Sequence, residues 1–236
     1  MVDEVDVEEE RQFWNEFAAE YAQIQAESQT TIQEDLAAFF TANGILPAAT
    51  FLDLAGGNGK YIAAFLPHVA QYTLVDFSSA MLQLIPQQEH LLLIEEDQQS
   101  FLARTPDQAF DVVFTAMNPA LRSPEALQEV LRIAKQTVCI VRLIDQRDLF
   151  SPLEELLGKE TEQQMDLYKS WLRVPYQATQ FTYHAEEVVT RAFFEEYFAE
   201  EVPQATLKQA ADDLFKGPTA VNQLTIVFEL LTINLN

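Results

Sequence analysis

The chain has 236 residues, of which 48% are hydrophobic, so it can bury the core of one α/β domain with insertions. Only 14 Lys and Arg residues stand against 37 Asp and Glu residues, and the net charge of −23 argues against nucleic-acid binding, because phosphate recognition needs clustered cations. No apolar run is as long as a membrane span, and the single cysteine, Cys139, excludes an internal disulfide and is compatible with a reducing cytoplasm.

The first 45 residues are expected to form an acidic tail followed by two helices. Residues 1–10 contain six acidic side chains and are predicted to be a flexible, solvated tail. Helical periodicity then predicts a helix over Arg11–Gln25 and a second one over Thr31–Thr41, which ends before Gly44. We expect residues 11–45 to act as a helical cap on the domain that follows.

From residue 50 onward, short apolar runs alternate with helical stretches. The runs predicted as strands are Thr50–Leu54, Tyr72–Val75, Leu91–Ile94, Asp111–Ala116 and Thr137–Leu143. The stretches predicted as helices are Lys60–Leu66, Ser78–Ile85, Gln98–Ala103 and Pro124–Lys135, the last with Ser123 as its cap. This alternation is typical of βαβ units, and it predicts a parallel sheet covered by helices.

The pattern changes after Asp145. Residues 146–184 are expected to be a helical, aromatic-rich insertion that serves as a lid. A helix is predicted over Ala185–Phe198, and the last two strands are predicted near Ala205–Gln209 and Gln223–Thr232.

A glycine-rich turn directly follows the first strand of this alternation. Glycine lets bare backbone approach a ligand, and the first N–H groups of the next helix lack partners within the helix, so the turn indicates a nucleotide-type cofactor site. The spacing does not fit a dinucleotide fingerprint, because Ile62 stands where the third glycine would be required after Gly57 and Gly59. A phosphate loop is also excluded, since Lys60 is followed by Tyr61 rather than by Ser or Thr.

The turn resembles motif I of the class I S-adenosylmethionine (SAM)-dependent methyltransferases, with Asp53, Ala55, Gly57 and Gly59 at the motif positions. The resemblance covers roughly residues 14–145. It implies an α/β fold with a doubly wound, mostly parallel seven-stranded sheet, helices on both faces and an antiparallel last strand. It also implies a single SAM-binding domain over residues 11–236, with SAM as cofactor.

The resemblance further implies a set of cofactor contacts at the carboxyl ends of the strands. Asp53 would fix the methionine end, Asp76 would accept hydrogen bonds from the ribose hydroxyls, and Asp97 would contact the adenine amino group. Asp76 could instead be a helix cap, and Asp97 could instead be a residue of a surface turn. The full set implied to bind the cofactor is Tyr21, Asp53, Ala55, Gly56, Gly57, Asn58, Gly59, Asp76, Phe77, Met81, Asp97, Gln98 and Thr115.

Within this set, Phe77 and Met81 would sandwich the adenine, and core packing is the alternative for either of them. The stripe of Trp14, Phe17 and Tyr21 is similar to an N-terminal region of small-molecule methyltransferases in which the tyrosine closes over SAM. Packing in the core is an equally good interpretation of that stripe.

Catalytic residues are harder to derive, because methyl transfer from a sulfonium mainly requires alignment of the reacting atoms. Asn118-Pro119 partly matches a motif of enzymes that methylate exocyclic amino groups, but Ala120 and Leu121 break the match. His184 is the titratable candidate, with a surface histidine as the alternative. No set of metal ligands is recognisable, so no metal is expected.

These observations favour a cytoplasmic SAM-dependent methyltransferase that acts on a small molecule, without nucleic-acid or membrane partners. Two alternatives stay open at this point: a SAM-binding sensor or inactive methyltransferase-like protein, and a nucleotide-cofactor oxidoreductase. The missing third glycine argues against the oxidoreductase. The sequence predicts neither the methyl acceptor nor the oligomeric state.

Overall fold

The structure is a computed structural model that describes residues 7–158 and 164–235. The chain divides into two compact units. The first unit comprises Met1–Arg142, Tyr168–Thr179 and Leu230–Asn236, and the second comprises Leu143–Leu167 and Gln180–Glu229. The glycine-rich turn and all the strand ends that follow it up to Ala116 belong to the first unit.

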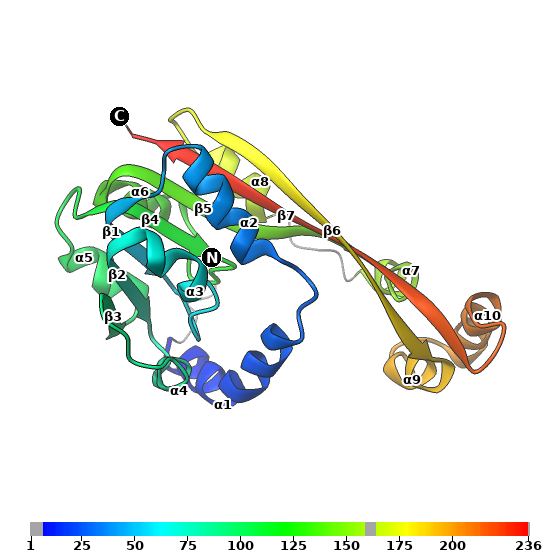
Figure 1. Cartoon of the computed structure of the whole chain (residues 1–236). Helices are drawn as coiled ribbons and strands as arrows, with labels where there is room; N and C mark the ends of the chain where they lie inside the picture. The colour runs from blue at the N-terminus through cyan, green and yellow to red at the C-terminus, as the bar shows by residue number, and fades with distance from the viewer. Residues whose placement is uncertain (1–6, 159–163, 236) are drawn as a thin grey trace. The chain divides into compact units, whose positions relative to one another are not determined.

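A seven-stranded sheet has the order β3-β2-β1-β4-β5-β7-β6 (Figure 1). Its strands are β1 (Ala48–Leu54), β2 (Val69–Asp76), β3 (Leu91–Glu95), β4 (Phe110–Ala116), β5 (Ala134–Arg147), β6 (Gln177–Thr190) and β7 (Thr219–Asn234). β1 to β5 pair in parallel, and the last strands are antiparallel. The predicted fold class and the first five predicted strands are confirmed.

Both faces of the central strands are covered. Successive side chains of a strand point to opposite faces, and Phe51, Leu52 and Leu54 of β1 are all fully buried. Aromatic rings fill one side of this core: Phe40 stacks on Phe65 with ring centroids 5.2 Å apart, and both pack edge-on against Phe114 of β4. The apolar runs read from the sequence are therefore buried strands of an open α/β sheet.

Two helices precede the first strand: α1 (Val7–Ala26) and α2 (Ile32–Ala42). The helices that connect β1 to β5 are α3 (Ile62–Phe65) with a 3-10 turn (Leu66–His68), α4 (Ser79–Gln83), α5 (Gln98–Arg104) and α6 (Pro124–Ile133). Ser123 caps α6 as predicted, because its hydroxyl accepts the N–H of Ala126 at 3.1 Å. α8 (Gln164–Trp171) carries Tyr168, which is fully buried.

The predicted acidic tail is partly wrong. Residues 1–6 lie outside the described residues, but residues 7–10 form the first turn of α1. Glu8, Glu9 and Glu10 stand at the N-terminal end of the helix, where negative charge is favourable to the helix dipole. Glu10 also pairs with Arg122.

Two predictions for the C-terminal part are wrong. Residues 205–209, predicted as a strand, lie in α10 (Gln204–Leu214), because Leu207 and Ala211 repeat at helical spacing and are buried together. The predicted helix from Ala185 begins only at α9 (Arg191–Tyr197). Residues 177–190 form β6 instead, so the end of the predicted insertion is a strand, while residues 159–163 of that insertion lie outside the described residues.

The second unit has a hydrophobic cluster of its own, built on α7 (Ser151–Leu156), α9 and α10. Its buried members are Phe150, Leu153, Val189, Phe194, Phe198, Val202, Leu207, Ala211 and Phe215. Across the part of the chain that the structure describes, no helix has the length and apolar character needed to cross a membrane.

Candidate cofactor site

The glycine-rich turn leaves the carboxyl end of β1 in a left-handed backbone conformation. Ala55, Gly57 and Gly59 have φ values of 58°, 56° and 77°. A Cβ on Gly56 would lie 2.6 Å from Cγ of Leu74 and 2.9 Å from Cγ of Asp53, so no larger residue fits there. A Cβ on Gly57 would meet nothing within 4 Å. The turn is thus pressed against the sheet at Gly56 and opens to free space at Gly57.

Asp76, at the end of β2, lies directly against this turn. Its Oδ2 accepts the backbone N–H of Gly57 at 2.8 Å, and its Oδ1 accepts that of Ser78 at 2.9 Å. Burial raises the pKa of Asp76 above its usual range, although these hydrogen bonds favour the charged form. A carboxylate held beside the open space at Gly57 is well placed to accept hydrogen bonds from a sugar.

Asp53 lies beneath the turn and is almost fully buried. Its Oδ2 accepts the hydroxyl hydrogen of Tyr72 at 2.7 Å. Burial raises the pKa of Asp53 to about 7; the Tyr72 hydrogen bond opposes that rise, and the charge of Asp76 adds to it. Asp53 therefore lies at the predicted place, but one of its oxygens already has a partner within the protein.

Asn58 adds an acceptor at the turn. Its Oδ1 is buried and accepts no hydrogen bond from the described residues. A buried acceptor without a donor is costly unless a ligand or water supplies one. Together with the open space at Gly57 and the Asp76 carboxylate, this atom fits a ligand that carries hydrogen-bond donors, as the amino and hydroxyl groups of SAM do.

The N-terminal helix α1 lies beside α4 and reaches the same region (Figure 1). Burial and the nearby charge of Asp76 raise the pKa of Tyr21, while a hydrogen bond to Gln25 lowers it, so the predicted closing tyrosine is within electrostatic reach of the carboxylate. The ring of Trp14 packs edge-on against that of Tyr21 at 5.4 Å. Sequence reasoning missed Asn15, whose Oδ1 accepts hydrogen bonds from Ser78 and Ala80. The sequence offered one indication of this role, because Asn15 is a polar residue directly beside Trp14 of the aromatic stripe.

The residues predicted around the adenine differ in exposure. Met81 of α4 is buried in the core, whereas Phe77 is half-buried. Asp97 caps α5 by accepting the N–H of Ser100 at 2.9 Å. Burial by itself would raise the pKa of Asp97. The hydrogen bonds with Ser100 and Gln99 and the charge of Arg11 on α1 outweigh burial, so the pKa of Asp97 lies below its usual value.

A polar network follows β4. The Asn118 amide donates to Oε1 of Gln98 at 2.6 Å and to Oγ1 of Thr115 at 3.0 Å, and its Oδ1 accepts the N–H of Ala120 at 2.8 Å. Thr115 in turn donates to the carbonyl of Leu54. Both amide hydrogens of Asn118 are thus used within the protein, which favours a structural role for this catalytic candidate.

The second catalytic candidate, His184, belongs to the other unit. It is exposed on β6, and its Nδ1 lies 3.2 Å from the hydroxyl of Thr225 on β7. Within the ranges 7–158 and 164–235, no group of three or more His, Cys, Asp or Glu residues could hold a metal ion.

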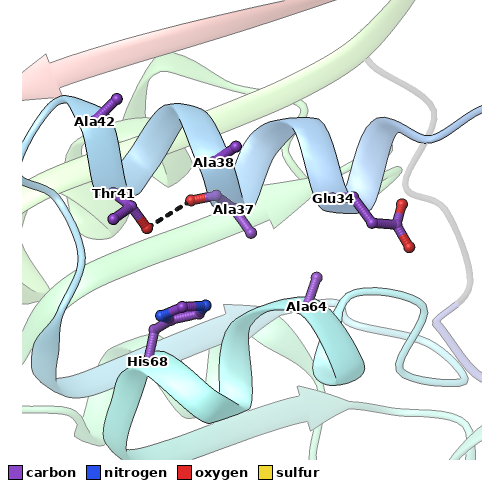
Figure 2. Close-up of a pocket in the computed structure, with 7 residues that line it drawn as sticks. All are labelled: Glu34, Ala37, Ala38, Thr41, Ala42, Ala64 and His68. Atoms are coloured by element: carbon purple, nitrogen blue, oxygen red, sulfur yellow. Dashed lines mark hydrogen bonds between the residues drawn. The ribbon is translucent and has the colours of Figure 1, made fainter.

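A groove of about 530 Å³ lies on another part of the first unit (Figure 2). It is lined by small side chains with Glu34 and His68 at its ends: Glu34, Ala37, Ala38, Thr41, Ala42, Ala64 and His68. Thr41 donates its hydroxyl to the carbonyl of Ala37 at 2.8 Å. None of the residues predicted to bind the cofactor lines this groove.

Comparison with known proteins identifies a methyltransferase domain in part of the chain. Residues 51–137 match the family model described as a methyltransferase domain. No curated protein sequence matches the chain. The matched segment begins in β1 and ends in β5, so it contains the glycine-rich turn, Asp76 and Asp97.

Solved structures share the fold at low sequence identity. Magnesium protoporphyrin IX methyltransferase (ChlM) from Synechocystis PCC 6803, solved with bound SAH, is 11% identical with a TM-score of 0.53, and the match covers 94% of this chain and 99% of that one. A proposed type II methyltransferase from Anaeromyxobacter dehalogenans is 14% identical with a TM-score of 0.55, and the match covers 84% of this chain and 95% of that one. The YcgJ protein from Bacillus subtilis is 17% identical with a TM-score of 0.52, and the match covers 84% of this chain and 97% of that one.

The turn, the strand order and the family match have one common explanation. Residues 51–137 match a methyltransferase domain, and the chain has the fold of methyltransferases of known structure, which supports a SAM-dependent methyltransferase.

Proposed function

We propose that this enzyme transfers the methyl group of SAM to a small-molecule acceptor, and that SAM lies between the glycine-rich turn and Asp76. The observation that carries the placement is the pairing of the open space at Gly57 with the Asp76 carboxylate, which the Gly57 N–H holds at 2.8 Å. Bound there, SAM supplies an activated methyl group on a sulfonium. The chain's own residues bind and orient the two reactants.

In this proposal the cofactor contacts come from three strand ends and from α1. Asp76 accepts the ribose hydroxyls, Asn58 Oδ1 accepts a donor from the methionine end, and Tyr21 covers the site from α1. Asp97 and Gln98 are assigned to the adenine side. Phe77 is the better of the two candidates for stacking on the base, because Met81 is buried among core residues.

A small-molecule acceptor is supported by charge. With 37 acidic and 14 basic side chains, the surface would repel a nucleic acid. Met117 follows β4 with φ of 52° and is 37% exposed at the carboxyl edge of the sheet, so we assign it to the acceptor side. We assign catalysis mainly to alignment of the acceptor atom with the methyl group and the sulfur of SAM. The candidate Asn118 is not assigned a catalytic role, because its amide hydrogens and oxygen are already hydrogen-bonded to Gln98, Thr115 and Ala120.

The test has two stages. Calorimetry measures SAM and SAH binding to the purified protein and to Gly57→Val, in which the added side chain enters the open space. Release of SAH is then measured with a small-molecule extract, a protein extract and a nucleic-acid extract as acceptor sources. Release only with small molecules supports the proposal. Release only with protein or nucleic acid contradicts the acceptor class, and tight SAM binding without release from any source favours the alternative of a SAM-binding sensor.

A further inference from the structure

The start of α4 is held by three acceptors, two from the segment just before the helix and one from α1. The N–H groups of Ser78, Ala80 and Met81 precede or open the helix and have no acceptor within it. Asp76 Oδ1 accepts the first, Asn15 Oδ1 the second at 3.2 Å, and Ser78 Oγ the third at 3.2 Å. The ribose-binding candidate and a residue of α1 therefore stabilise the same turn.

Asn15 is bound to this turn twice. Besides the N–H of Ala80, its Oδ1 accepts the hydroxyl hydrogen of Ser78 at 2.8 Å. Ser78 is fully buried, so its hydroxyl would lack an acceptor if α1 moved away. A continuous series of hydrogen bonds thus runs from the Gly57 N–H through Asp76 and Ser78 to Asn15.

A second polar contact joins α1 to the segment between β4 and α6, and it is more exposed. Glu10 pairs with Arg122, but their side chains are 28% and 38% exposed. Such partly solvated ion pairs contribute little to stability, because water and salt screen them. The Asn15 contacts are therefore the stronger polar connection between α1 and the cofactor site.

We propose that Asn15 is a positioning residue that couples closure of α1 to the orientation of Asp76. This inference rests on the proposed function, because it assumes that Asp76 binds the ribose. With α1 in place, Asn15 fixes the Ser78 turn, and that turn holds Asp76 Oδ1 by its N–H. When α1 opens, Ser78 and Ala80 lose their acceptor, the turn loosens, and the carboxylate is no longer held for the sugar.

The test compares Asn15→Ala with Gln12→Ala. Gln12 is a matched control because it lies on the same helix and, among the described residues, its amide donates to Glu16 of that helix and to no residue near the cofactor site. We expect Asn15→Ala to raise the Kd for SAM about tenfold, which corresponds to about 1.4 kcal/mol, and Gln12→Ala to leave it unchanged. Hydrogen exchange along α1 is expected to increase in Asn15→Ala only.

Two further measurements separate coupling from simple loss of stability. In a Trp171→Phe background, Trp14 becomes the only tryptophan, and its fluorescence change on SAM addition reports closure of α1. We expect that change to be lost in Asn15→Ala. Ser78→Ala removes the donor of the hydrogen bond between Ser78 and Asn15, and Asn15→Ala removes its acceptor. The double variant Asn15→Ala/Ser78→Ala should therefore bind SAM more tightly than the sum of the two single effects predicts.

A Kd for SAM that is equal in Asn15→Ala and the unaltered protein would overturn the coupling, even if the melting temperature falls. Strict additivity of the two single variants would overturn it as well. If the unaltered protein and Gln12→Ala both fail to bind SAM, the proposed function itself is contradicted. The two failures are thus distinguishable.

Discussion

Gly57 and Gly44 offer a matched pair of substitutions that isolates ligand binding from backbone strain. Both glycines have positive φ values, 56° and 71°, and a Cβ on either would meet nothing within 4 Å. Left-handed backbone costs an L-residue about 1–2 kcal/mol, so Gly57→Ala and Gly44→Ala should lose similar stability. For a chain of this size, that loss lowers Tm by roughly 2–8 °C.

The two variants should differ in SAM binding. Gly44 follows α2 and has no part in the predicted site, whereas the space in front of Gly57 is where we place the cofactor. We expect Gly44→Ala to keep the SAM affinity of the unaltered protein. Gly57→Ala should weaken it at least about tenfold, or about 1.4 kcal/mol, and Gly57→Val should abolish it.

Calorimetric titration with SAM and thermal unfolding without ligand give the two quantities. Equal SAM affinity in folded Gly57→Val and Gly44→Ala would refute the placement of the cofactor. A much larger loss of stability in Gly57→Ala than in Gly44→Ala would refute the reading of the space at Gly57 as open.

Three further predictions follow from individual side chains. Asp76→Ala should weaken SAM binding by about 1.5–3 kcal/mol, and it should also lower the free energy of unfolding because the Gly57 and Ser78 N–H groups lose their acceptor. The ratio of the affinity for SAM to the affinity for a 2′,3′-dideoxy analogue should fall in the variant, and an unchanged ratio contradicts ribose binding by Asp76. Since burial raises the pKa of Asp53 to about 7, the folded state binds a proton that the unfolded state releases above about pH 4, so this residue lowers stability as pH rises from about 4 to 7. Asp53→Asn cannot ionise at this position, so its free energy of unfolding relative to that of the unaltered protein should be higher at pH 8 than at pH 5, as measured by urea unfolding. A relative free energy of unfolding that is the same at both pH values argues against a raised pKa of Asp53. Tyr168→Phe removes the hydrogen bond to the Leu121 carbonyl and should cost about 1 kcal/mol in urea unfolding with the Kd for SAM unchanged; a changed Kd would connect this residue to the cofactor site.

Much of the fold could be predicted because its signals are local. The apolar runs of β1 to β5 lie between helical stretches at regular spacing, and buried parallel strands require such runs. The glycine-rich turn is equally local, since Gly56 and Gly57 act through their own backbone and through residues that the neighbouring strands bring near. From these features the fold class, the resemblance to methyltransferases and SAM as cofactor could be predicted.

The C-terminal part was ambiguous for a physical reason. Short runs of mixed apolar and polar residues fit both periodicities, and the surrounding packing decides between them. Residues 205–209 became helical because Leu207 is buried against the core of the second unit, and residues 177–190 became a strand within the sheet.

Only the tertiary structure decided how the site is held. Asn15 and Ser78 are 63 positions apart, and nothing in the sequence pairs them. The same holds for Tyr168, a predicted lid residue whose hydroxyl bonds to Leu121 in the first unit, and for Asn118, whose amide is used by Gln98 and Thr115. Sequence patterns report which face of an element is buried, but the partner of a polar side chain depends on which distant elements the sheet brings together, and that is set by the fold as a whole.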